Sequence, residues 1–326
     1  MKITFGLLAL LTLMVVFSSC EEDILIKGEF RQKYTLNGIV NGDDSTQFVS
    51  ILQNYDVEGI DPSINEENMF ISGAYVRMWY KDTVYILTDT LISITKQNGQ
   101  LDEVGIYYTN DFKPAFGERV EIEALLENGR RLKSYTDVPK KIDFVLDEVG
   151  VDESAREIPG PYENKFELAW SSVSNKQFYR PRFKIIYDRY FAYDDTRRYE
   201  EVPSEYIESE GEYIPVYSGI TQGGAGYFSL EALDIAMQKI SEGMPVKSGF
   251  RIMLLQVEVT IVDQFLAAYY SSSGNLQDEY SISLDKSDYT NIEGGFGIFG
   301  SKIIQKTSFT LEPDYIKSFG YNPFYE

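Results

Sequence analysis

Short stretches in which apolar and polar residues alternate set the strongest limit on the fold of this chain. Within residues 74–80, Val76 and Met78 alternate with Arg77 and Trp79. Because neighbouring side chains of a strand point to opposite faces, this period of two predicts half-buried β-strands. The same pattern occurs at residues 120–124 and 166–170.

A hairpin motif supports this interpretation of the first part of the chain. Asn128-Gly129 separates two strand-like runs, and Pro139 ends the second of them. Asn-Gly between such runs is the strongest short-range hairpin signal. Short strands joined by turns of this kind predict an immunoglobulin-like β-sandwich for residues 33–139.

The remainder, residues 140–326, is expected to form a β-rich domain with two short helices, so the predicted class is all-β to α+β. Apolar residues recur with helical spacing near residues 229–242, where Ser229 can cap the first turn. A second helix is expected near residues 263–273. The charged, Tyr-rich segment 190–213 is interpreted as an extended loop or irregular hairpin.

The chain begins with the features of an export signal. Lys2 precedes an apolar run over residues 3–17, which is shorter than the roughly 20 residues that a membrane-spanning helix needs. Ser18-Ser19-Cys20 then resembles a lipobox, in which small residues precede a lipidated Cys. Residues 1–19 are therefore expected to be a signal peptide and Cys20 the lipid attachment site. The alternative is a buried thiol behind an uncleaved segment.

Cys20 is the only cysteine, so disulfides are excluded. A diacylglycerol on its thiol and an acyl chain on its amino group would anchor the protein stably. Residues 20–32 are interpreted as an acidic tether that starts with Glu21-Glu22-Asp23. This triplet resembles the signal that sends Bacteroidota lipoproteins to the outer leaflet, which predicts an outer-membrane protein facing the cell exterior. The alternative is a solvated tether without an address.

Composition excludes several kinds of chemistry. The chain has no histidine, so Ser-His-Asp and Cys-His catalysis and histidine-bound metals are unavailable. A net charge of −21 argues against nucleic acid as a partner. Carboxylate chemistry survives, but only Trp79 and Trp170 could serve as strong sugar-stacking platforms, and Trp170 has the pattern of a core residue. We expect no enzyme, no metal and no cofactor; a carboxylate-dependent glycosidase is the remote alternative.

Residues 295–300 match G-x-G-x-x-G, the pattern of dinucleotide-binding loops. Such a loop needs a strand before it and a helix after it, whereas residues 301–310 are typical of a strand. The glycines are better explained by a strand that passes close to another backbone.

A family resemblance rests on the lipobox, the acidic start, Thr136-Asp137-Val138-Pro139 and the segment Asn291-Ile292-Glu293-Gly294-Gly295 with the glycines after it. Together they resemble the Bacteroidota lipoproteins of domain-of-unknown-function family 4249. Members typically lie beside TonB-dependent outer-membrane receptors of the SusC type. The resemblance implies an accessory role in uptake or at the cell surface, and it brings no catalytic residue.

The leading expectation is thus a surface lipoprotein that acts as an accessory or ligand-binding subunit of a TonB-dependent transporter; the alternative is an adhesin or structural surface protein. Two sets of surface residues are candidates for further roles. Those for partner contact are Tyr190, Tyr193, Tyr199 and Tyr206, whose alternative is a solvated loop. Those for O-glycosylation are Ser45, Thr83 and Thr90, whose contexts resemble an Asp-Ser/Thr-apolar acceptor.

Overall fold

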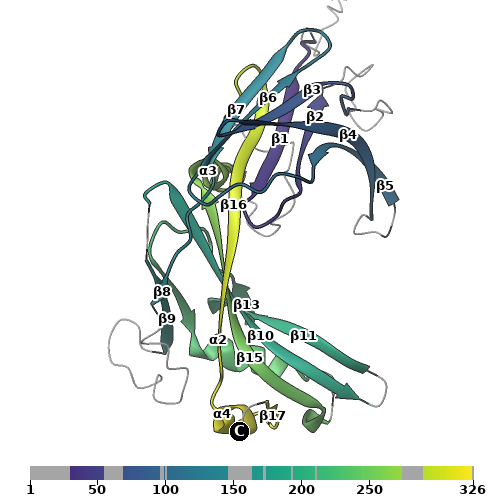
Figure 1. Cartoon of the computed structure of the whole chain (residues 1–326). Coiled ribbons are helices and arrows are strands. Elements are labelled where there is room, and N and C mark those ends of the chain that lie inside the picture. The colour runs from purple at the N-terminus through teal and green to yellow at the C-terminus, as the bar shows by residue number, and fades with distance from the viewer. Residues whose placement is uncertain are drawn as a thin grey trace, which may run out of the picture. The chain divides into compact units, whose positions relative to one another are not determined.

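Twelve strands in the described part of the chain pair into one mixed sheet in this computed structural model (Figure 1). All of them belong to one compact unit, which comprises residues 33–53 and 69–326. The other unit comprises residues 1–32 and 54–68. In it, the Asn54 side chain donates a hydrogen bond of 3.0 Å to the Arg31 carbonyl. The described residues are 30–54, 69–95, 99, 101–145, 164–171, 174–191, 194–209, 211–244, 246–273 and 289–324.

The first seven strands come from residues 33–139. They are β1 (Tyr34–Asn41), β2 (Gln47–Gln53), β3 (Tyr75–Tyr80), β4 (Thr83–Thr95), β5 (Leu101–Thr109), β6 (Arg119–Leu125) and β7 (Arg131–Asp137). They are adjacent in the order β1-β2-β5-β4-β3-β6-β7. The long strand β4 pairs with β3 through its first half and with β5 through its second. The predicted Asn-Gly hairpin joins β6 to β7, and Gly129 has the positive φ of +81° that the turn requires.

The other strands follow Pro139. They are β8 (Phe144–Val145), β9 (Lys165–Trp170), β10 (Gln177–Phe191), β11 (Asp194–Val202), β12 (Glu205–Ser209), β13 (Glu212–Val216), β14 (Ala225–Ser229), β15 (Phe250–Asp263), β16 (Phe296–Phe309) and β17 (Asn322–Pro323). In the large sheet, β11, β10, β15 and β16 are neighbours. Strands β14, β9 and β8 form a separate sheet, and β12 and β13 form a hairpin.

Strand β16 joins the two parts of the sequence (Figure 1). Residues 302–309 pair antiparallel with β15, and residues 296–302 pair parallel with β1. Strand β7, the last strand in the sheet order, also contacts the residues just before β16. There, Lys133 and Glu293 exchange backbone hydrogen bonds of 3.0 and 2.8 Å. The strands of residues 33–139 therefore curl around a shared core. The division into an immunoglobulin-like β-sandwich domain at residues 33–139 and a second domain at residues 140–326 stays a prediction.

The expectation of a β-rich fold with few helices is confirmed. The two predicted helices are α2 (Leu230–Lys239) and α3 (Gln264–Ser273), and the sequence did not predict α4 (Pro313–Ser318) or the 3₁₀ turn η3 (Lys247–Gly249). Ser229 caps α2 by accepting a hydrogen bond from the Ala232 amide. Asp263 does the same for α3 at the Leu266 amide, at 2.9 Å. Among the described residues, no helix has the length and apolarity to cross a membrane.

The prediction of an extended loop or irregular hairpin at residues 190–213 is wrong, because the end of β10, all of β11 and β12 and the first two residues of β13 lie there as regularly paired strands. The outward face of β11 carries charged side chains that form ion pairs with β10, so the sequence of this strand lacks the apolar alternation by which a strand is recognised. For example, Arg197 on β11 donates to Asp188 on β10 at 2.9 Å. Cross-strand pairs of opposite charge stabilise a sheet without producing an apolar period of two.

The interpretation of the glycine-rich run as a strand is confirmed. Residues 296–300 begin β16, and a side chain at Gly297 would overlap the carbonyl oxygen of Leu36 on β1. Gly297 also has a φ of +104°, which other residues rarely adopt. The run lets two backbones approach closely.

Candidate functional site

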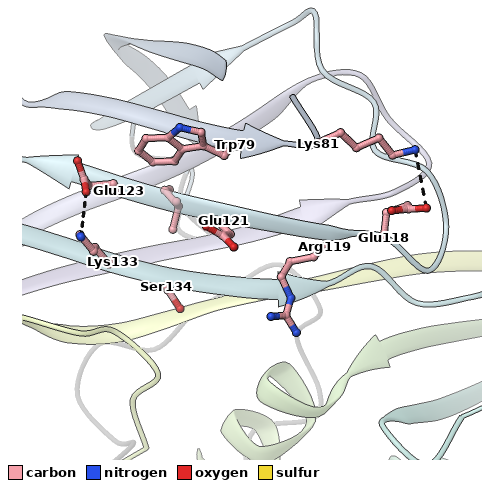
Figure 2. Close-up of a pocket in the computed structure, with 9 residues that line it drawn as sticks. Trp79, Lys81, Glu118, Arg119, Glu121, Glu123, Lys133 and Ser134 are labelled. Atoms are coloured by element: carbon pink, nitrogen blue, oxygen red, sulfur yellow. Dashed lines mark ion pairs between the residues drawn. The ribbon is translucent and has the colours of Figure 1, made fainter. Parts of the chain in front are cut away.

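An open depression on the outward face of β3, β6 and β7 is the candidate site (Figure 2). Its volume is about 570 Å³. Its walls carry one large aromatic ring, three acidic and three basic side chains. The lining residues are Trp79, Lys81, Glu118, Arg119, Glu121, Ile122, Glu123, Lys133 and Ser134.

The strand register brings these side chains together. Trp79 on β3 lies opposite Glu121 on β6, and Glu121 lies opposite Tyr135 on β7. Side chains in directly opposed positions have Cβ atoms about 5 Å apart. The alternate residue Met78 points to the other face and is buried in the core, and Ile122, which also borders the depression, is only 2% exposed. Burial of one face thus fixes which residues line the depression.

A buried carboxylate organises one end of the depression. Glu123 has a side chain only 8% exposed, and it forms an ion pair with Arg77. It forms a second ion pair, of 3.3 Å, with Lys133 (Figure 2). Burial alone would raise the pKa of this carboxyl, but the hydrogen bonds and charges of Arg77 and Lys133 lower it below its usual value. Glu123 is therefore ionised at neutral pH and unsuited to act as a general acid.

The same arginine supports the aromatic ring. The Arg77 guanidinium lies 4.7 Å from the ring centre of Trp79 and 4.9 Å from that of Tyr75. Cation–π contacts of this kind are attractive. Because Glu123 holds Arg77, the stack of Tyr75, Arg77 and Trp79 along β3 is fixed in place.

A second arginine is fixed in a similar way on the next strands. Arg119 donates to both carboxylate oxygens of Asp137, at 2.7 and 3.2 Å. Its guanidinium lies 4.1 Å from the ring centre of Tyr135, and the Tyr135 ring meets Phe265 edge-on. The hydrogen bond from Arg119 to Asp137 raises the pKa of the arginine further. Arg119 thus enters the depression as a fixed, planar donor.

At the far end, Lys81 pairs with Glu118 at 3.7 Å, and both side chains are largely exposed (Figure 2). Glu121 lies between Trp79 and Tyr135 and is exposed. The depression therefore offers an immobilised ring together with exposed donors and acceptors. Such an arrangement suits binding by stacking and hydrogen bonds.

Within the described residues, no group of three or more Asp, Glu or Cys side chains is placed to hold a metal ion.

The two tryptophans have different environments. Trp170 is 4% exposed and packs against Tyr179 in the core, as its pattern predicted. Trp79 lines the depression. Sequence reasoning singled out Trp79 but missed Arg77, Arg119 and Lys133. Alternation already placed Arg77 and Trp79 on one face, but nothing local indicated that β3 and β6 are neighbours.

The predicted anchor lies outside the described residues, as do Cys20, Glu21, Glu22 and Asp23. Of the candidate glycosylation sites, Ser45 is exposed between β1 and β2, and Thr83 is exposed at the start of β4. Thr90 is half-buried within β4. All three remain predictions.

The candidate contact tyrosines are divided between two places. Tyr190 and Tyr199 are exposed on the same face of the β10–β11 pair, since Tyr199 lies opposite Ile186. Their rings contact Arg251 and Lys184, respectively. Tyr206 on β12 is half-buried and accepts a hydrogen bond of 2.9 Å from Lys239. Tyr193 lies outside the described residues.

No protein-family model matches this chain, and no curated protein matches it either.

Proposed function

We propose that this protein is a lipid-anchored binding protein of the outer membrane that serves as an accessory or ligand-binding subunit of a TonB-dependent, SusC-type transporter. The observation that carries the proposal is the depression beside Trp79, where fixed charges and an aromatic ring are displayed. Its one buried carboxyl, Glu123, has a lowered pKa. Glycosidases need a carboxylic acid with a raised pKa, so the site favours binding over hydrolysis.

Exposed apolar side chains support contact with a protein partner. The paired parts of β4 and β5 expose Leu91, Ile92, Ile94 and Leu101, with exposures of 53%, 38%, 40% and 71%. By the alternation of strand side chains, Ile92 and Ile94 lie on one face of this pair and Leu91 and Leu101 on the other. Groups of exposed apolar side chains often mark interaction sites. A lipid anchor at Cys20 would confine the chain near a barrel in the same membrane, so modest contacts would suffice. The resemblance to family 4249 is the reason to expect a TonB-dependent barrel of the SusC type as the partner.

Affinity purification from outer membranes in mild detergent tests this proposal. We expect tagged protein to recover a TonB-dependent barrel. Two variants locate the contact: Ile92→Ser with Ile94→Ser on β4, and Tyr190→Ala with Tyr199→Ala on the β10–β11 face. Tyr213→Ala is the matched control, because Tyr213 is 61% exposed on a different hairpin. Recovery of the lipoprotein alone, where other lipoprotein–receptor pairs survive, would favour an adhesin.

A further inference from the structure

We propose that the depression beside Trp79 binds a neutral saccharide. This inference rests on the proposed function, because it names the ligand class of a binding subunit. The first observation concerns the indole ring. Arg77 stacks on Trp79 at 4.7 Å but lies outside the lining of the depression, whereas Trp79 is part of it. One side of the indole ring therefore contacts Arg77, and another side borders the depression.

A supported indole that faces open space fits a sugar ring. The C–H groups of a pyranose form a flat apolar surface, which stacks on an aromatic face, while its hydroxyls project around the rim. Trp79 offers the largest aromatic surface of any side chain type. Exposed Glu121, directly opposite on β6, can accept hydrogen bonds from hydroxyls at that rim.

The charges indicate that the ligand is neutral. Lys81, Arg119 and Lys133 face Glu118, Glu121 and Glu123 around one space. An anion would be repelled by the three glutamates, and a cation would be repelled by the three basic groups. A neutral polyhydroxyl ligand can instead donate to the carboxylates and accept from the basic groups. Charge-assisted hydrogen bonds of both directions are stronger than those between neutral groups.

The site is also preorganised. Glu123 holds Arg77 behind the indole, and Asp137 holds Arg119 through two hydrogen bonds. Groups already fixed in the free protein lose little conformational entropy on binding. An open site on a sheet face admits a chain of sugars passing across it, so an internal stretch of an oligosaccharide is the expected ligand.

Titration calorimetry on the purified, lipidated chain in detergent micelles tests the inference without any barrel present. The probes are four neutral hexasaccharides: maltohexaose, cellohexaose, mannohexaose and xylohexaose. We expect saturable binding of at least one. Its affinity should be nearly constant between about 0.05 and 0.5 M NaCl, because salt screens charge–charge attraction and leaves a neutral ligand unaffected.

Three variants assign the binding to this site. Trp79→Ala should abolish it, Trp79→Tyr should retain part of it, and Glu121→Gln should weaken it about tenfold, as expected for loss of one charged hydrogen-bond partner. Tyr213→Ala, on another hairpin, should change nothing. Circular dichroism checks that each variant is folded. Tryptophan fluorescence gives a second readout, since Trp79 and buried Trp170 are the two tryptophans.

Failure to bind all four sugars would overturn the inference, and so would binding that survives Trp79→Ala and Glu121→Gln. Saturable binding of neutral tripeptides without any sugar would assign another ligand class and also overturn it. These outcomes are separate from the purification of a barrel. Sugar binding without a barrel would reject the transport role alone, and a barrel without sugar binding would reject only this inference.

Discussion

Asp263 lies where four elements meet, and its carboxyl has the most unusual environment in the described part of the chain. It accepts hydrogen bonds from Thr136 on β7 at 2.6 Å and from the Leu266 amide in α3 at 2.9 Å. The Thr136 hydroxyl in turn accepts from the Ser301 hydroxyl on β16, at 2.7 Å. Burial raises the pKa of Asp263 from 3.8 to about 7, although these hydrogen bonds oppose the rise.

This raised pKa predicts a pH-dependent stability. The folded protein binds the Asp263 proton more tightly than the unfolded chain does, so this residue's contribution to stability falls as pH rises from about 4 to about 7 and is constant above that. Asp263→Asn keeps an oxygen for the Leu266 amide and carries no charge. We therefore expect its melting temperature to decline less than that of the wild type between about pH 5 and pH 8. Equal declines would contradict the prediction, and the comparison removes the general effect of the net charge of −21.

The candidate site was partly predictable at this scale. Alternation identified Trp79 as a surface ring and Trp170 as a core residue, because the pattern within a single strand shows which of its side chains face the core. The partners of Trp79 were not predictable. Arg77 and Glu123 meet only because β3 and β6 are adjacent, and no local pattern encodes adjacency between strands that are separated along the chain.

Among the elements, β16 depends most on its glycines. Gly297 has a φ of +104°, and a Cβ atom there would collide with the Leu36 carbonyl and lie 2.6 Å from the Asn37 side-chain oxygen. Gly297→Ala should lower the free energy of unfolding by about 3 kcal/mol or more, since backbone strain and overlap add. Gly223→Ala is the matched control, because its Cβ would meet only the Thr221 hydroxyl at an ordinary 3.4 Å. Urea denaturation measures both; equal midpoints would refute the close approach of β16 to β1.

The elements also show where local patterns fail. Strands with one buried face and a strong turn, such as β6 and β7, were predicted well. Strand β11 was not, because its outward residues are charged and paired with β10. The parallel pairing of β1 with β16 was equally hidden, since it joins residues 35–41 to residues 296–302.

For the whole molecule, the proposed membrane location depends on a single residue. Cys20→Ala should leave the chain without lipid, because Cys20 is the only cysteine and thioether formation needs a thiol. In detergent phase separation, the wild type is expected in the detergent phase and the variant in the aqueous phase. Ser19→Ala, which keeps a small residue beside the Cys, is the control and should behave as the wild type does. A variant that stays in the detergent phase would show that something other than this lipid holds the protein.

The pairing of β1 with β16 also constrains how the protein reaches its native state. Asn37 accepts a hydrogen bond from the Ile298 amide, 261 residues away along the chain. Contacts of such high sequence separation raise the contact order and slow folding. During synthesis, β1 appears early and must wait for almost all of the remaining chain before its second edge is covered. Until then that edge can pair with other chains. Folding after the whole chain has been made, as the proposed export would impose, therefore suits this topology better than domain-by-domain folding on the ribosome.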